Sequence, residues 1–218
     1  MKRSILTAAI FVGLLLCPAK ALFSQKTAVY SYPIEIELTN DQGDMLTKDY
    51  LKNYGTKGKR RGIEIMYENV TPFLIDRLQK AGIGILPIDT LSVVKSNEYG
   101  KPSATLSKAV ATGIADQYMK VYLKEVTQPD LASMAQQDVN VQKHKIVKMS
   151  CRIQLYDNKK KLIKEAEGEF QSGDKIENPS ELGVDFRKYQ GSEYLQEVKI
   201  YETCCKMSVI KALARLAQ

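Results

Sequence analysis

Few side chains in this sequence have the type and spacing needed for catalysis. The only histidine, His144, lies in a lysine-rich stretch, and no Cys-x-x-Cys pair offers a zinc-binding spacing. Three glutamates, Glu165, Glu167 and Glu169, recur at alternate positions, which suits contact with solvent or with a cation. Without a recognisable nucleophile or general base, we expect no catalytic activity, no cofactor and no metal. One alternative stays open, a hydrolase whose two catalytic carboxylates lie far apart in the sequence.

The cysteines of the predicted mature chain occupy apolar positions. Cys151 falls on the apolar side of a predicted strand, and Cys205 falls on the apolar stripe of the last predicted helix. If that helix packs on that strand, the two thiols could form a disulfide in an oxidising compartment. The interpretation that the pattern favours is simpler, namely that both cysteines are small buried hydrophobic side chains.

A basic segment, GTKGKRRG at residues 55–62, is the first candidate for contact with a partner. Its glycines predict a flexible loop, but its spacing differs from that of a phosphate-binding loop, and no Ser or Thr follows Gly58-Lys59. The loop either docks on an anionic surface, such as lipid or glycan, or is an ordinary solvated turn. Its cationic residues are Lys57, Lys59, Arg60 and Arg61.

Tyrosine side chains supply the second candidate. The chain has 12 tyrosines and no tryptophan, and an aromatic ring with a polar tip suits protein interfaces. Tyr118 and Tyr122 fall on one face of a predicted strand and form the best single patch. The alternative is that the two rings pack beneath a helix.

The element that must position these residues is a predicted hairpin at residues 146–170. Apolar and polar residues alternate strictly in its first half, as in a strand with one buried face. Asp157-Asn158-Lys159 supplies the turn, and alternation then resumes. A helix at about residues 192–217 carries an apolar stripe that should cover the hairpin. The positions of that stripe are Tyr194, Val198, Tyr201, Cys205, Val209, Ala212 and Leu216.

Shorter elements precede the hairpin. In chain order they are an irregular lead-in at 22–33, an edge strand at 33–38, a helix at 45–54, a helix from an N-cap at Thr71 to a stop at Gly82, an inner strand at 83–88, a helix at 103–114 and a strand at 116–126. Together they predict an α+β fold, a mixed β-sheet whose long antiparallel hairpin is covered by the C-terminal helix and two further helices. We divide the chain into an N-terminal strand with a flexible basic loop at 22–62 and a single α/β domain at 63–218.

The N-terminus has the layout of a secretory signal peptide. Two basic residues are followed by an apolar stretch, and Ala19-Lys20-Ala21 matches a cleavage site. We expect residues 1–21 to be removed and the chain to be exported to the periplasm or cell envelope. A lipoprotein anchored through Cys17 is the weaker alternative, because a small residue normally precedes a lipidated cysteine and here Leu16 does. No later segment predicts a transmembrane span, which needs about 20 apolar residues.

The net charge does not favour a nucleic-acid partner. The formal net charge is +7, and it falls to +4 once Lys2, Arg3 and Lys20 are removed with the signal peptide. A charge of this size does not require a polyanionic ligand. We therefore expect a protein partner in the envelope and no nucleic acid.

Three stretches resemble a group of bacterial envelope domains. They are LQKAGIGIL at 78–86, where a helix leads into a strand, ADQYMKVYL at 115–123, and YDNKKKL at 156–162, which looks like the paired strands and turn of those domains. The group comprises the amino-terminal domain of TolB (the Tol-system beta-propeller protein), the curli secretion channel lipoprotein and the lipoprotein activators of penicillin-binding proteins. The resemblance covers about residues 66–217. It implies a partner-binding scaffold in the envelope, without catalysis.

These observations predict an exported, non-catalytic binding protein that acts as an adaptor or assembly factor in the periplasm or envelope. Two alternatives belong to other classes of protein. One is an envelope hydrolase with a carboxylate pair, and the other is a module that binds anionic lipid or glycan through the basic loop.

Overall fold

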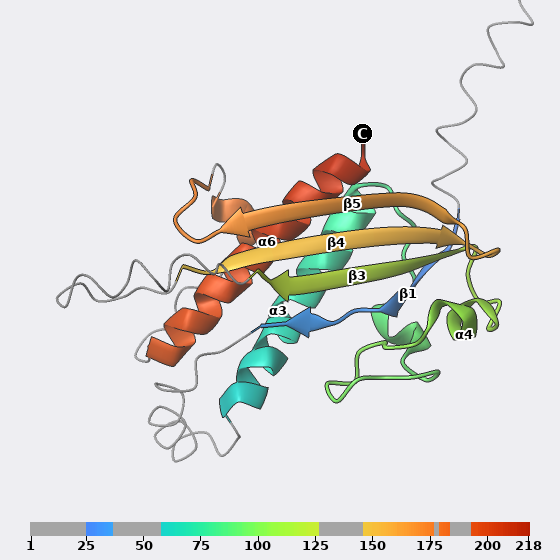
Figure 1. Ribbon diagram of the computed structural model, residues 1–218, viewed down its shortest axis with the longest axis horizontal. Coiled ribbons are helices and arrows are strands. Elements are labelled where there is room, and N and C mark those ends of the chain that lie inside the picture. The colour runs from blue at the N-terminus through green and yellow to red at the C-terminus, as the bar shows by residue number, and fades with distance from the viewer. Residues whose placement is uncertain (1–24, 37–57, 127–145, 177–178, 184–192) are drawn as a thin grey trace, which may run out of the picture.

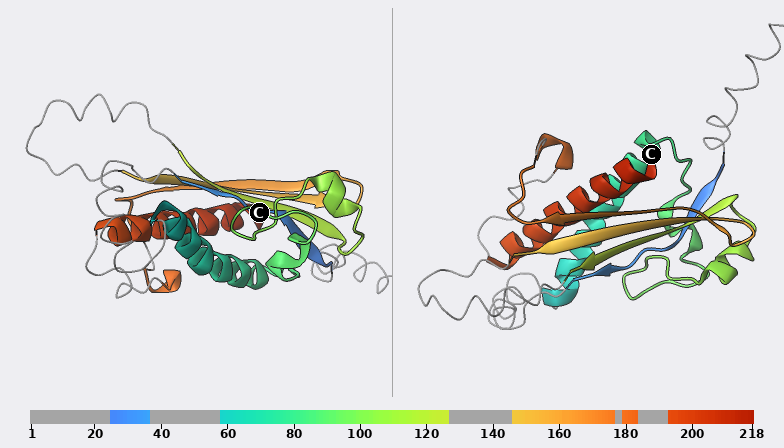
Figure 2. Two further views of the ribbon diagram at one scale, coloured as in Figure 1. Left: turned by 90° about the horizontal axis from the view of Figure 1, so that it is seen from below. Right: turned by 45° about the horizontal axis from the view of Figure 1, so that its top comes forward.

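The predicted hairpin forms the centre of a mixed five-stranded sheet (Figure 1). This computed structural model describes residues 25–36, 58–126, 146–176, 179–183 and 193–218, with the backbone alone at 58–61 and 193–196. Two long helices cover one face of the sheet, which gives the molecule two layers (Figure 2). The predicted α+β class, with a C-terminal helix on the sheet, is therefore confirmed.

The sheet has the strand order β1-β3-β4-β5, and β2 also pairs with β3. Strands β1 (Thr27–Ser31) and β2 (Ile34–Glu35) run parallel to β3 (Gln117–Glu125). Strand β4 (Lys148–Asp157) is antiparallel to β3 and to β5 (Leu162–Gln171). The β4–β5 hairpin and β3 thus lie where the alternating sequence predicted them.

Helices α3 (Gly58–Lys80) and α6 (Glu193–Leu216) pack on the same face of the sheet and on each other. Helix α4 (Leu106–Val110) lies at one end of the sheet, packed on its opposite face. The 3₁₀ turn η1 (Ile88–Leu91) lies beside β1, with Leu91 in the core of that opposite face and Ile88 in the core on the α3 side. In the part of the chain that the structure describes, no helix combines the length and apolarity needed to cross a membrane.

The main core lies between the sheet and the two long helices. Buried side chains of one parity in β3, β4 and β5 meet the apolar stripes of α3 and α6 in this core. Its largest contributors from the sheet are Met119, Leu123, Met149, Ile153 and Phe170. A second, smaller core lies on the opposite face, beneath α4 and η1. Its buried members are Ala28, Tyr30, Leu91, Ala109, Ala115 and Tyr118.

Helix α3 corrects two predictions. It begins at Gly58, so residues 58–62 are helical and do not belong to a flexible loop, and the predicted domain boundary at 62/63 falls inside it. It also runs through Pro72, where an N-terminus was expected at Thr71. Burial of an apolar stripe on both sides of the proline outweighs the one backbone hydrogen bond that proline removes. The stripe consists of Ile63, Met66, Tyr67, Val70, Leu74 and Leu78.

Two shorter elements were also predicted wrongly. Residues 83–88 do not form an inner strand, because only Ile85 bridges to Thr27 and Pro87 stops further pairing. The helix predicted at 103–114 is limited to α4, with Thr105 as its N-cap. The lead-in predicted as irregular contains β1. The helix predicted at 45–54 lies outside the described residues.

Candidate functional site

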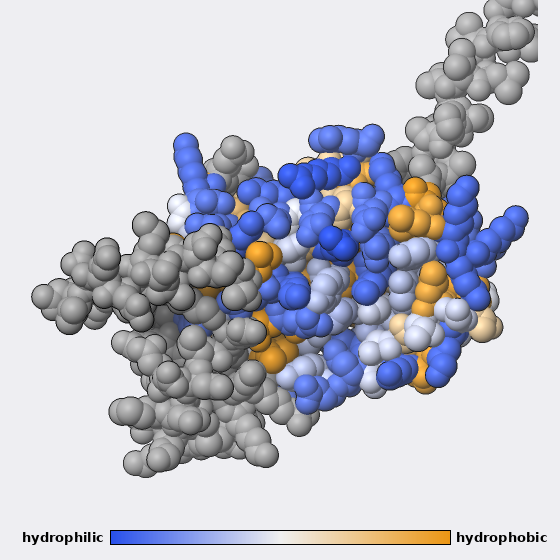
Figure 3. Space-filling model, in the orientation of Figure 1, coloured by the Kyte–Doolittle hydropathy of each residue, from blue (hydrophilic) through white to orange (hydrophobic). Residues whose placement is uncertain are grey.

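The face of the sheet opposite α3 and α6 is the strongest candidate for a site. The strand register places nine side chains on it in three rows that run from β3 through β4 to β5. We use the name open sheet face for these nine residues. The rows are Lys120, Gln154 and Glu165; Tyr122, Arg152 and Glu167; and Lys124, Ser150 and Glu169. Hydrophilic residues dominate the middle of this face (Figure 3).

Arg152 and Glu167 form the central polar contact of the open sheet face. Arg152 Nη2 lies 2.9 Å from Glu167 Oε2, and Ser150 Oγ donates to Glu167 Oε1 at 2.6 Å. The hydrogen bond from Ser150, with that from Arg152, lowers the pKa of Glu167 below its usual value. The side chains of Arg152 and Glu167 are 49% and 38% exposed, so water screens the pair and its contribution to folding stability is small. The contact therefore fixes geometry more than it stabilises the fold.

The neighbouring rows repeat this arrangement. Gln154 Nε2 donates to Glu165 Oε1 at 3.0 Å, and Lys148 Nζ lies 2.6 Å from Glu169 Oε2. Lysines on β3 and glutamates on β5 give the open sheet face a basic side and an acidic side. Such a surface recognises a partner through complementary charge.

Tyr122 adds an aromatic ring to this surface. Its hydroxyl donates to Glu35 Oε2 at 2.5 Å, and Lys120 Nζ lies 5.6 Å from the ring centroid. Burial, together with the hydrogen bond to Glu35, raises the pKa of Tyr122 to about 12, so the hydroxyl stays protonated at neutral pH. The ring is half-buried, and Glu35 and Lys120 both contact Tyr122, so the ring provides a rigid contact for a partner.

Tyr118 does not belong to this surface. It is 0% exposed and lies in the second core beneath α4, and its hydroxyl has no hydrogen-bond partner within the described chain. The prediction that Tyr118 and Tyr122 form one exposed patch is therefore wrong for Tyr118. The two rings do lie on one face, but α4 and η1 cover only the end that holds Tyr118.

The three described cysteines are buried and their thiols are free. Cys151 and Cys205 both lie in the main core, as their apolar positions predicted, and no disulfide joins them in this structure. Burial raises the pKa of Cys204 to about 12 and raises those of Cys151 and Cys205 above the ordinary range. A thiol with a raised pKa is a poor nucleophile, because the thiolate is the reactive form.

A shallow hollow beside β5 brings two carboxylates together. Its lining residues are Glu167, Glu169, Lys211, Ala214, Arg215 and Gln218. A glycosidase needs one of its two carboxyl groups protonated as the general acid. The environment of Glu167 lowers its pKa and so disfavours the protonated form, and Glu169 is held in an ion pair with Lys148. Among the residues described, no cluster of three or more metal-ligating side chains occurs either.

The basic residues predicted as a contact loop are only partly described. Lys59, Arg60 and Arg61 belong to the first turn of α3, while Lys57 lies outside the described residues. The structure therefore replaces the flexible loop by a helical turn at these three positions. Docking of this turn on lipid or glycan stays a prediction.

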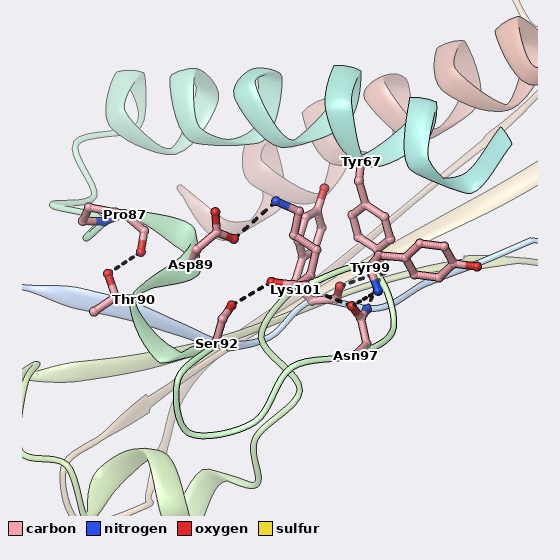
Figure 4. A network of polar contacts seen from close by, with 10 residues as sticks. Tyr67, Pro87, Asp89, Thr90, Ser92, Asn97, Tyr99 and Lys101 are labelled. Atoms are coloured by element: carbon pink, nitrogen blue, oxygen red, sulfur yellow. Dashed lines mark hydrogen bonds and ion pairs between the residues drawn. The ribbon is translucent and has the colours of Figure 1, made fainter. Parts of the chain in front are cut away.

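A polar cluster around Asn97 was not predicted from the sequence (Figure 4). Asn97 Nδ2 donates to the hydroxyl of Tyr67 at 3.1 Å, and its Oδ1 accepts from the backbone N–H groups of Tyr99 and Lys101. The same Tyr67 hydroxyl accepts from the N–H of Ile34 at 3.0 Å. The cluster ties the loop before α4 to α3 and β2, so it stabilises the fold. An asparagine next to a glycine-containing turn was its only signal in the sequence.

A second buried cluster joins α3, α6 and η2 (Pro179–Leu182). Lys206 Nζ lies 2.6 Å from Glu202 Oε1 and donates to the carbonyl oxygen of Leu182 at 2.8 Å. Asn69 Nδ2 donates to the other oxygen of Glu202 at 2.9 Å. Because Lys206 and Glu202 are almost fully buried and mutually paired, this cluster is structural.

Comparisons of the chain with protein-family models, with curated proteins and with solved structures found no match. The class of protein is therefore defined by the fold and the site alone. It is a two-layer α+β domain that covers one sheet face with helices and presents polar side chains on most of the other. The resemblance to bacterial envelope domains stays a prediction from the sequence.

Proposed function

We propose that this chain is an exported, non-catalytic binding protein of the cell envelope, an adaptor or assembly factor whose protein partner docks on the open sheet face. The observation that carries the proposal is the asymmetry of the sheet. One face is buried by α3 and α6, while three rows of polar side chains stand on the other, with α4 and η1 at one end only.

The geometry of the open sheet face favours binding in two ways. Arg152 and Glu167 hold each other, and Glu35 holds the hydroxyl of Tyr122, so these side chains lose little entropy when a partner docks. Arginine and tyrosine are also the residue types enriched among side chains that dominate binding energy. Export is supported by the N-terminal sequence, which has the layout of a signal peptide.

The test uses the chain expressed in its own organism with a photo-crosslinking amino acid at position 122. We expect one partner to be captured in a defined ratio, and Arg152→Ala to weaken its binding by about tenfold or more. A crosslinker at exposed Lys95, which lies outside the open sheet face, should capture nothing. Absence of a captured partner, or equal capture from positions 95 and 122, would count against the proposal.

A further inference from the structure

The two edges of the sheet differ in how their backbone groups are used. Along β1, the N–H of Thr27 donates to the carbonyl of Gly84 and its carbonyl accepts from Leu86, both at 2.8 Å. The carbonyl of Tyr30 accepts from the N–H of Ala104 at 2.9 Å. Residues 84–86 and 102–104 therefore occupy the β1 edge, and no further strand can pair there.

The edge formed by β5 is different. Successive residues of a strand point their backbone groups to opposite sides, and Ser172 donates to Val147 of the β4 segment. Residues of even number in β5 thus pair with β4, and those of odd number turn their N–H and C=O groups outward. The carbonyl of Glu167 accepts from Arg215 at 2.6 Å.

Several outward groups of β5 remain without a partner in the described chain. They are the N–H and C=O of Glu165 and Glu169 and the N–H of Glu167. In Figure 1 the edge is the uppermost strand of the sheet, and α6 passes behind it and rises above it at its C-terminal end. An open edge of this kind is a template for another strand.

A hollow in the surface flanks this edge. The shallow hollow described above lies between β5 and the last turns of α6, and Lys211, Ala214 and Arg215 form its wall. A strand placed there would turn alternate side chains toward α6 and the others toward the open sheet face. The latter would lie beside Glu165, Glu167 and Glu169, at the separation of cross-strand neighbours.

We propose that β5 accepts an extended segment of the partner protein as an additional strand, with lysine or arginine at every second position. This inference rests on the proposed function and specifies how the partner is held. The backbone groups of Glu165 and Glu169 and the N–H of Glu167 provide the pairing, and the three carboxylates select a basic segment. The β5 edge of a second copy of this chain would bring like charges together, so the same glutamates disfavour self-association.

The probe is a short synthetic peptide in which lysine alternates with valine, titrated into the protein and followed by amide hydrogen exchange. We expect exchange at Glu165, Glu167 and Glu169 to slow by about tenfold or more at saturation, because their N–H groups become hydrogen-bonded. A peptide with glutamate in place of lysine should not bind. A peptide whose pairing amides are N-methylated should not bind either, because it keeps the charge but cannot form the ladder.

Substitutions at position 165 separate backbone pairing from charge. Glu165→Pro removes an outward N–H and leaves the β4 ladder intact, so we expect it to abolish peptide binding. Glu165→Gln keeps the N–H and should weaken binding only about threefold. Asp76→Asn on α3 is the matched control and should change nothing. Thermal unfolding of each variant verifies that the fold persists.

Two results would overturn the inference. One is failure of the lysine peptide to bind the native protein. The other is that the lysine peptide binds Glu165→Pro, or the N-methylated peptide binds the native chain, as tightly as the lysine peptide binds the native chain. Either result would mean that charge alone holds the peptide. Capture of the partner from position 122 is a separate measurement. Suppose that the partner is captured from position 122 while Glu165→Pro binds the lysine peptide as tightly as the native chain does. The inference that β5 accepts an added strand then fails, and the proposed function stands.

Discussion

At the scale of single residues, Gly168 decides how closely α6 approaches the sheet. It lies on the inner parity of β5, between Ala166 and Phe170. A Cβ atom added at this position would overlap the backbone nitrogen of Ala212 and the backbone oxygen of Ser208. Both atoms belong to a helix backbone, which cannot move aside as a flexible side chain can. Glycine is therefore required here by contact, not by backbone angle.

Gly168→Ala should lower the free energy of unfolding by about 3 kcal/mol, the upper part of the range for overpacked sites. Gly113→Ala is the matched control, since Gly113 has a φ of +63° and no atom within 4 Å of an added Cβ. That change should cost only about 1 kcal/mol, the penalty for an ordinary residue in the left-handed region. Urea denaturation of both variants measures the difference. Equal costs would contradict the close approach of α6.

The sequence predicted only part of the candidate site, because a local pattern does not reveal what packs on each residue or which residue it pairs with. Alternation correctly placed Tyr118 and Tyr122 on one face of β3, and Cys151 on the buried side of β4. It could not reveal that α4 and η1 cover Tyr118, because period-two patterning identifies a face but not what packs on it. The pairing of Arg152 with Glu167 depends on strand register, which no local pattern gives.

At the scale of elements, the strongest periodicities gave the correct answers. The β4–β5 hairpin and α6 are long and strictly patterned, so their existence and type followed from the sequence. Strand β1 was missed because four of its five residues are buried, which leaves no alternation to detect. In α3, Thr71 followed by Pro72 has the pattern of a helix N-terminus. The helix is nevertheless continuous, because its apolar stripe extends on both sides of this pair.

The internal proline of α3 leads to a prediction of its own. Pro72 is exposed and has no N–H to donate to the carbonyl of Glu68, four residues earlier. Pro72→Ala should raise the free energy of unfolding by about 1 kcal/mol, because the restored hydrogen bond exceeds the entropy gained by the unfolded chain. Gln79→Ala, an exposed change in the same helix, should stay within about 0.5 kcal/mol. An unchanged or lower stability of Pro72→Ala in urea would show that the helix needs its proline to place Leu74 in the core.

At the scale of the whole molecule, the fold places ionisable groups where they cannot easily lose a proton. Burial raises the pKa values of Tyr32 and Tyr67 above the usual 10.0, as it does those of the cysteines. Tyr32 and Tyr67 pack edge to face at a centroid distance of 5.4 Å in the main core, which also holds Cys151 and Cys205. These tyrosines and cysteines of the main core are therefore uncharged at physiological pH.

This neutrality predicts a loss of stability in alkali. Above about pH 9 the thiols of the unfolded chain release protons, whereas Cys204, with a pKa of about 12, keeps its proton in the folded chain. The unfolded state then binds fewer protons than the folded state, so the free energy of unfolding falls as pH rises from 9 toward 12. Each such group contributes a slope of up to about 1.4 kcal/mol per pH unit. Urea denaturation at pH 7, 9 and 10.5 measures it.

Cys204→Ala provides the control, because a cavity lowers stability equally at every pH while the missing thiol makes the alkaline slope shallower. Below about pH 8 the difference between this variant and the native chain should be constant, since Cys204 keeps its proton there in both the folded and the unfolded chain. Above pH 9 the two curves should converge. Parallel curves up to pH 10.5 would mean that the thiol ionises as readily in the folded chain as in the unfolded one. Cys204 would then be open to water, and the packing of α6 on the sheet would be looser than described.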